Sequence, residues 1–161
     1  MAEAAAVELI RRLSAGSLTL AAAESCTAGL VADLLAQIPG ASRVFWGSYV
    51  CYTAAAKEAM LGVAGDLIRR YGAVSRETAL AMAEGALGRS GADLAVAVTG
   101  LAGPEGDGST VPVGTVWIGV KLREGEGRMT RFHYAGSRNE VRLAAALDAL
   151  RESVQCLKKN G

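Results

Sequence analysis

Histidine is almost absent from this chain, because His133 is the only one in 161 residues. A histidine-rich metal site is therefore excluded, and a serine–histidine triad would depend wholly on His133. That residue lies in an alternating segment typical of a β-strand, where a structural or solvent-exposed role is more common than catalysis. Hydrolytic chemistry in this chain would need a different base.

Cysteine is also scarce, and its three copies form no CxxC pair: Cys26, Cys51 and Cys156. An odd number without paired spacing argues against a zinc knuckle and indicates a reducing compartment. No apolar run approaches the roughly 18 residues that a membrane span needs, and the N-terminal residues lack the apolar centre of a signal peptide. We therefore expect a cytoplasmic protein with no membrane partner.

An excess of charge of either sign is missing too, since the net charge is +1 and the basic residues are scattered along the sequence. A nucleic-acid partner therefore has little electrostatic support. Apolar residues make up 51% of the chain, which suffices for one domain with a full hydrophobic core. We treat residues 1–161 as a single domain.

Strand-like and helical segments alternate along the chain. The expected strands cover residues 18–23, 43–53, 94–98, 114–122 and 128–134, and the expected helices cover 2–13, a segment ending near 38, 53–61, 64–71, 75–89 and 137–157. Thr53, Ser75 and Ser137 are expected helix caps, and Ser25 or Thr27 could cap the helix after the first strand or leave its amides to an anion. The pattern predicts an α/β fold: one three-layer α/β/α domain with a mixed sheet, ending in an antiparallel hairpin.

A glycine-rich loop from Thr99 to Gly114 joins two apolar strands, and a loop of this length is usually functional. It is not a P-loop, because the required lysine is replaced by Ser109 and a strand follows instead of a helix. The dinucleotide pattern GxGxxG is absent, and Glu105 and Asp107 would repel a phosphate placed over the loop tip. We expect the loop to form one wall of a ligand site.

Lys57 is the lysine in the most apolar setting of the four in the chain. Burial of an ammonium group lowers its pKa, and a neutral lysine can take a proton from a serine hydroxyl. A solvated lysine on a helix surface is the simpler interpretation. Ser42 follows a Pro-Gly turn and Tyr52 lies five residues before Lys57, so both could face the same pocket; they could equally be a turn residue and a core aromatic.

Several ordered motifs resemble the CinA C-terminal domain family, whose enzymes are nicotinamide-nucleotide amidases. The motifs are Glu24-Ser-Cys-Thr-Ala-Gly29, Pro39-Gly-Ala-Ser42, Tyr52 with Lys57, Gly72-Ala-Val-Ser75, Val98-Thr-Gly-Leu-Ala-Gly-Pro104 and Pro112-Val-Gly-Thr115. The resemblance covers roughly residues 5–157. It implies hydrolysis of the carboxamide of nicotinamide mononucleotide to nicotinate mononucleotide and ammonia, by a serine–lysine mechanism without a metal or cofactor. It also implies a homo-oligomer, and we expect a dimer.

The resemblance also implies roles for individual residues. Ser42 would be the nucleophile, with Ser25 as the second choice, Lys57 would be the general base, and Tyr52 would assist proton transfer or orient Lys57. Amides near Gly40 and after Ser25 would stabilise the oxyanion. The residues expected to bind the substrate are Gly40, Cys26, Thr27, Thr99, Gly100 and Gly103, with Arg138 and Arg142 for the phosphate.

The chain departs from the family pattern at three positions. Ala54 and Ala55 replace an asparagine–glutamate pair that is common before the lysine, and Val111 replaces a lysine before the Pro-Val-Gly element. These changes affect positioning and turnover rather than the proposed serine, tyrosine and lysine. The alternative function is a non-catalytic nucleotide-binding or regulatory domain, and ammonia release distinguishes the two.

Overall fold

The computed structural model describes residues 2–160, which form a five-stranded mixed sheet with the strand order β2-β1-β3-β4-β5. The strands are β1 (Leu20–Glu24), β2 (Phe45–Val50), β3 (Leu94–Gly100), β4 (Thr115–Leu122) and β5 (Gly127–His133). Strand β1 pairs in parallel with both β2 and β3, whereas β3–β4 and β4–β5 pair antiparallel. The predicted mixed sheet and terminal hairpin are confirmed.

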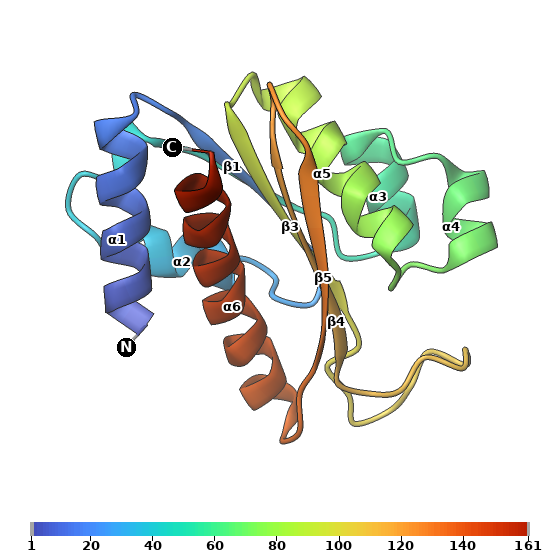
Figure 1. The fold of residues 1–161 in the computed structure, drawn as a ribbon. Coiled ribbons are helices and arrows are strands. Elements are labelled where there is room, and N and C mark those ends of the chain that lie inside the picture. Colours follow the sequence, from blue (N-terminus) through green and yellow to red (C-terminus); the bar gives the residue numbers. More distant parts are fainter. Residues whose placement is uncertain (1, 161) are drawn as a thin grey trace.

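The helices cover both faces of the sheet (Figure 1). They are α1 (Ala2–Ala15), α2 (Leu30–Ala36), α3 (Ala54–Leu61), α4 (Gly65–Tyr71), α5 (Arg76–Ser90) and α6 (Arg138–Lys159), with a short 3₁₀ turn η1 (Ala41–Arg43) before β2. Helices α1, α2 and α6 lie together on one face, and α3, α4 and α5 lie on the other. The predicted three-layer α/β/α architecture is therefore confirmed.

The two faces of the sheet bury different side chains. Towards α6 the central strands present Leu, Val and Ile residues, including Leu94, Val96 and Ile118. Towards α5, the apolar side chains of β1 and β3 are alanines: Ala21, Ala23, Ala95 and Ala97. Because these side chains are small, α5 packs close to the sheet, and Met82 on α5 is fully buried.

Side-chain caps fix where three helices begin, as the sequence predicted. The hydroxyl oxygens of Thr53, Ser75 and Ser137 each accept a hydrogen bond from a backbone amide in the first turn of α3, α5 and α6. The predicted cap of α2 by Ser25 or Thr27 is wrong. Residue Gly29 precedes α2 without a side-chain cap, because the carboxylate of Glu24 binds the amides there instead.

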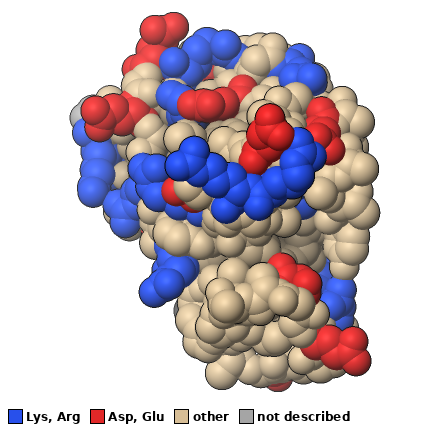
Figure 2. All heavy atoms as spheres, turned by 90° about the vertical axis from the view of Figure 1, so that its right-hand side faces the viewer, with Lys and Arg blue, Asp and Glu red and all other residues tan. Residues whose placement is uncertain are grey.

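The surface carries both signs of charge. Figure 2 shows Lys and Arg side chains gathered in a band across the middle of one face, with acidic side chains above and below it. Basic residues that are scattered along the sequence therefore lie close together on this face. Because acidic side chains lie on the same face, it does not carry charge of one sign only. Among the described helices, none combines the length and apolar character that crossing a membrane requires.

Candidate active site

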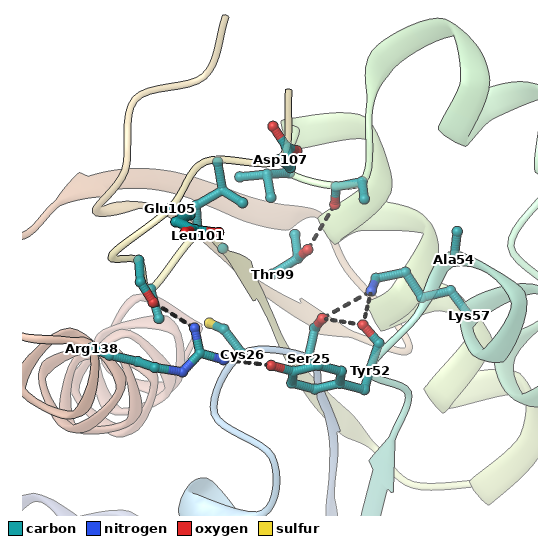
Figure 3. Close-up of a pocket in the computed structure, with 15 residues that line it drawn as sticks. Ser25, Cys26, Tyr52, Ala54, Lys57, Thr99, Leu101, Glu105, Asp107 and Arg138 are labelled. Carbon is teal, nitrogen blue, oxygen red and sulfur yellow. Dashed lines mark hydrogen bonds between the residues drawn. The ribbon is translucent and has the colours of Figure 1, made fainter. Parts of the chain in front are cut away.

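A pocket lies where the parallel strands β1, β2 and β3 end at their carboxyl termini (Figure 3). Carboxyl ends of parallel strands are the usual location of ligand sites in open α/β sheets. The loops after these strands and the start of α6 form its walls. The lining residues are Ser25, Cys26, Tyr52, Ala54, Lys57, Ala73, Val74, Thr99, Gly100, Leu101, Ala102, Gly103, Glu105, Asp107 and Arg138.

Ser25 and Lys57 meet at the centre of this pocket. The Lys57 Nζ atom lies 2.9 Å from the Ser25 hydroxyl oxygen, within hydrogen-bond distance. The same ammonium nitrogen donates to the carbonyl oxygen of Cys51 at 3.2 Å and to that of Tyr52 at 3.4 Å. Ser25 follows strand β1, and Lys57 lies in the first turn of α3, which follows the neighbouring strand β2, so the adjacent carboxyl ends of β1 and β2 bring the pair together.

Burial makes Lys57 an unusual lysine. Its side chain is only 1% exposed, and no ion pair joins it to a carboxylate anywhere in residues 2–160. Desolvation lowers the pKa of Lys57 below its ordinary value, against a smaller opposing effect of the Cys51 and Cys26 thiols. A lysine with a lowered pKa beside a serine hydroxyl has the arrangement of a general base next to a nucleophile.

Glu24 organises the loop that carries Ser25. Its carboxylate is fully buried and accepts hydrogen bonds from the backbone amides of Gly29, Val31 and Ala32 and from the Ser48 hydroxyl. These are the amides that open α2, so Glu24 satisfies the positive end of that helix from within the protein. The expectation that these amides are free to bind a substrate anion is therefore wrong.

Arg138 and Tyr52 face each other across the mouth of the pocket. The guanidinium of Arg138 donates one hydrogen bond to the Gly103 carbonyl oxygen and another, of 2.7 Å, to the Tyr52 hydroxyl oxygen. Arg138 is exposed, and the Tyr52 side chain is 51% exposed. The pocket rim thus carries the positively charged Arg138, and the carboxylates of Glu105 and Asp107 lie on the loop after β3, which Arg138 contacts through Gly103 (Figure 3).

Glycine residues allow the loop after β3 to form a pocket wall. At Gly100 an added Cβ would lie 2.6 Å from a methyl group of Val116, and Gly103 has a φ of +87° that L side chains rarely adopt. Thr99, beside them, is 1% exposed and donates its hydroxyl proton to the Ala73 carbonyl oxygen at 2.7 Å. The hydroxyl of Thr99 therefore holds the loop before α5 against this wall.

Ser42 and Gly40 lie outside this pocket. Both line a separate hollow with Ala36, Ile38, Ala41 and Phe45. Ser42 belongs to η1, which precedes the amino end of β2, whereas Lys57 follows the carboxyl end of the same strand. The length of β2 therefore separates the two residues, and the geometry supports Ser25 instead of Ser42 as the partner of Lys57.

Arg142 is hydrogen-bonded to the loop that carries Ser25, and neither Arg142 nor Thr27 lines the pocket. The Arg142 guanidinium donates to the carbonyl oxygen of Cys26 at 2.8 Å, to that of Thr27 at 3.2 Å and to the Asn139 side chain at 3.1 Å. Its nitrogen atoms thus hold the loop that carries Ser25, and the residue does not line the pocket. Thr27 is fully buried, and within residues 2–160 its hydroxyl oxygen has no hydrogen-bond partner.

Most of the pocket lining is predictable from the sequence, but the buried carboxylate of Glu24 behind it is not among the expected residues. Of the expected residues, Ser25, Cys26, Tyr52, Lys57, Thr99, Gly100, Gly103 and Arg138 line it. Glu24 was missed as a functional residue, although an acidic residue that directly ends an all-apolar strand is a signal, because such a position is buried. The described residues contain no group of three or more His, Cys, Asp or Glu side chains that could hold a metal ion.

Comparison with known proteins identifies the family. Residues 2–157 match the CinA C-terminal domain. The chain belongs to this family. As expected for a CinA C-terminal domain, it is 47% identical over 151 residues to a CinA-like protein of Akkermansia muciniphila, covering 89% of this chain and 36% of that protein. The chain thus spans about a third of the length of such CinA-like relatives.

One relative is about as long as this CinA domain. It is the nicotinamide-nucleotide amidohydrolase PncC of Enterobacter agglomerans, 40% identical over 154 residues that cover 96% of this chain and 94% of that protein. Solved structures of the superfamily have the same fold. A competence/damage inducible protein of Agrobacterium tumefaciens matches with a TM-score of 0.92 at 44% identity, covering 98% of this chain and 95% of that chain. A CinA superfamily protein of Escherichia coli matches with 0.94 at 35%, covering 97% and 90%.

Proposed function

We propose that this chain is an amidohydrolase that converts nicotinamide mononucleotide to nicotinate mononucleotide and ammonia. The observation that carries the proposal is the buried Lys57 amine 2.9 Å from the Ser25 hydroxyl, in a pocket at the carboxyl ends of the parallel strands. A pure binding domain has no need of a desolvated lysine beside a serine, whereas an amidase without a histidine base does.

In the first half of the proposed reaction, Ser25 Oγ attacks the carboxamide carbon of the substrate. Neutral Lys57 takes the hydroxyl proton as the new C–O bond forms, and the carbonyl oxygen becomes an oxyanion. The same proton then passes from Lys57 to the amide nitrogen, the C–N bond breaks, and ammonia leaves. The carbonyl oxygens of Cys51 and Tyr52, which accept from Nζ, keep the lysine aimed at Ser25 throughout.

In the second half, water hydrolyses the resulting ester of Ser25. Lys57 removes a proton from the water, a second oxyanion forms, and the proton returns to Ser25 as the acid is released. The backbone amide of Cys26 is the proposed oxyanion donor, because it directly follows the nucleophile. Gly40, which was also expected to contribute, lines a different hollow.

The substrate is proposed to lie between Arg138 and the Ser25–Lys57 pair. Arg138 suits the phosphate, because its guanidinium is exposed at the rim of the pocket, whereas the nitrogens of Arg142 are bound to backbone carbonyls and to Asn139. Thr99, Gly100 and Gly103 form the wall against which the nucleoside packs, and Cys26 lies next to the nucleophile. Within residues 2–160, Arg138 is then the basic side chain of the pocket rim that is available to an anion, and Val111 stands where the family pattern has a lysine.

The name of the Enterobacter agglomerans relative supports this proposal, since that protein is a nicotinamide-nucleotide amidohydrolase of nearly the same length. Other relatives are named only CinA-like proteins. The competing function is a nucleotide-binding or regulatory domain without catalysis. It would use the same pocket and Arg138, but it would not depend on Lys57.

Ammonia release from nicotinamide mononucleotide by the purified protein tests the proposal. We expect steady release by the wild-type chain and a loss of at least about 10³-fold in Lys57→Ala, because that change removes the only base next to Ser25. Binding of the mononucleotide by Lys57→Ala, measured by calorimetry, should remain within a few-fold of wild type. Binding without ammonia release by the wild-type chain would instead establish the regulatory alternative.

We also propose a cytoplasmic homodimer as the working form. The three cysteines are unpaired and buried, which fits a reducing compartment. Strand β2 lies at an edge of the sheet and exposes Trp46 and Val50, by 51% and 42% respectively, so it offers an apolar surface for a second copy. Light scattering of the purified chain checks this, and a monomer at all concentrations would contradict it.

A further inference from the structure

Tyr52 contacts both functional parts of the pocket at once. Its hydroxyl oxygen accepts a 2.7 Å hydrogen bond from Arg138, while its carbonyl oxygen accepts from Ser25 Oγ at 3.2 Å and from Lys57 Nζ at 3.4 Å. We propose that Tyr52 is a positioning residue that couples occupancy of Arg138 by the substrate phosphate to the alignment of Ser25 and Lys57. This inference rests on the proposed function, because it assigns the phosphate to Arg138.

The backbone on either side of Tyr52 is fixed. The amide of Cys51 donates to the Glu24 carbonyl oxygen at 2.9 Å, which ties the end of β2 to β1. Thr53 begins α3, where its hydroxyl oxygen accepts from the Ala56 amide at 3.1 Å. Between these anchors only Tyr52 itself can rotate, so a contact that holds its ring also restricts rotation of its carbonyl group.

Arg138, which donates to the Tyr52 hydroxyl, is available to bind an anion. Arg138 is exposed, its ion-pair distance to every carboxylate in residues 2–160 exceeds 4.0 Å, and its two hydrogen bonds go to neutral oxygens of Gly103 and Tyr52. A phosphate that binds this guanidinium fixes its orientation, and with it the N–H group that donates to the Tyr52 hydroxyl. The half-exposed Tyr52 ring then becomes ordered, and with it the carbonyl that faces Ser25 and Lys57.

The link predicts how the phosphate contributes to the reaction. Binding energy from a group remote from the scissile bond can be used to align reacting atoms, and it then raises kcat and not only the affinity. The hydroxyl of Tyr52 contacts Arg138 and is not hydrogen-bonded to Lys57, so it is placed for coupling and not for direct proton transfer. Figure 3 shows the Tyr52 ring extending from the Ser25–Lys57 pair towards Arg138.

A substrate divided into two pieces tests this coupling. Nicotinamide riboside has the carboxamide but no phosphate, and inorganic phosphite can occupy a phosphate site separately. For the wild-type chain we expect saturating phosphite to raise kcat/KM for ammonia release from nicotinamide riboside by at least about 10-fold, the size of one charged hydrogen bond. In Tyr52→Phe the activation should fall below about twofold, although phosphite still binds with a similar half-saturating concentration.

Two variants sharpen the result. Arg138→Ala should lose both the activation and the phosphite binding, whereas Tyr71→Phe, which removes a hydroxyl from an exposed tyrosine on α4, should behave as wild type. With intact nicotinamide mononucleotide, the double variant Tyr52→Phe/Arg138→Ala should reduce kcat no more than the worse single variant, because both changes break one link. Reductions that multiply, or full phosphite activation in Tyr52→Phe, would overturn the coupling.

The same assays separate this inference from the proposed function. If wild type releases no ammonia from nicotinamide mononucleotide, the amidase proposal and the coupling are both wrong. If wild type hydrolyses the mononucleotide but phosphite does not activate nicotinamide riboside, the amidase proposal stands and the coupling alone is overturned.

Discussion

Ser25 and Ser42 lie at opposite ends of two parallel strands, and their surroundings differ in kind. Ser25 follows the carboxyl end of β1, is 6% exposed and contacts Lys57. Ser42 precedes the amino end of β2, is exposed and lines a hollow formed mainly by small and apolar residues. In the register of β1 and β2, Leu20 pairs with Phe45 and Glu24 with Val50, so the two serines are separated by the full length of the strands.

The difference between the two serines shows that the buried polar groups gather at the carboxyl end of the parallel strands. At the carboxyl end, Glu24, Ser25, Lys57 and Thr99 are all buried and hydrogen-bonded to one another or to the backbone. Burial of such groups carries a desolvation cost, and the hydrogen bonds among them compensate for it.

The largest expected difference is between the two serines themselves. Ser25→Ala should lower kcat for ammonia release by about 10³-fold or more, because it removes the proposed nucleophile. Ser42→Ala should stay within about twofold of wild type, since its side chain is exposed and far from Lys57. Steady-state kinetics on both variants decides the point, and the reverse outcome would restore Ser42 as the nucleophile.

The parts of the fold that could be predicted from the sequence are those that depend on residues close to one another along the chain. The apolar run from Leu94, the caps at Thr53, Ser75 and Ser137, and the glycine loop all depend on residues close in sequence, and each was predicted. The choice between Ser25 and Ser42 depends on strand order and direction, which no local pattern contains. Ser25 follows an expected strand and Ser42 precedes one, so the rule for carboxyl ends of parallel strands favours Ser25 once β1 and β2 are known to be parallel.

Contacts between a side chain and backbone groups far away in the sequence could not be predicted, for the same reason. Arg138 and Arg142 lie one helical turn apart on α6 and are indistinguishable by spacing. Only the folded chain brings the carbonyl oxygens of Cys26 and Thr27 against Arg142 and leaves Arg138 at the pocket. Glu24 likewise gained its role from the amides of α2, which the sequence analysis had assigned to Ser25 or Thr27.

Two carboxylates at opposite ends of the sheet provide the second comparison. Glu24 accepts four hydrogen bonds at the carboxyl end, whereas Asp93, just before β3, accepts two from Thr19. Glu24→Ala leaves several buried donors unsatisfied and should reduce the free energy of unfolding by roughly 2–4 kcal/mol, against about 1–2 kcal/mol for Asp93→Ala. Urea unfolding measures both.

Activity distinguishes the two carboxylates further. Glu24→Ala should also lower kcat by at least about 10-fold, because the loop that carries Ser25 loses its anchor, and Glu24→Gln should recover part of that loss. Asp93→Ala should retain wild-type kcat under conditions where it is folded. Equal kcat values for Glu24→Ala and Asp93→Ala would mean that Glu24 supports only stability.

Two lysines provide the third comparison, through the pH dependence of stability. The lowered pKa of Lys57 means that, between this value and the ordinary 10.5, the unfolded chain holds a proton that the folded chain has released. Stability therefore rises with pH across that window. Lys57→Met should be more stable than wild type at pH 7, with a Tm higher by about 2–4 °C for each kcal/mol, and the gap should close towards pH 10.5. Lys158→Met, at an exposed position, should show no such gap.

The smallest expected effect concerns the acidic residues at the rim of the pocket. Glu105 and Asp107 are exposed, and the hydrogen bonds from Ser109 lower the pKa of Asp107, so this carboxylate remains charged at neutral pH. The pyridinium ring of the proposed substrate is a cation, which these carboxylates attract. The double variant Glu105→Gln/Asp107→Asn should raise KM for nicotinamide mononucleotide by about 2- to 5-fold with little change in kcat, since exposed charge pairs contribute less than about 1 kcal/mol each.

Glu124→Gln, in the turn at the other end of the sheet, should leave KM unchanged. Because solvent ions screen exposed charges, the difference should shrink between 0.05 and about 0.5 M salt. A lower KM in the double variant would mean that the substrate presents its phosphate, and not its ring, to this rim.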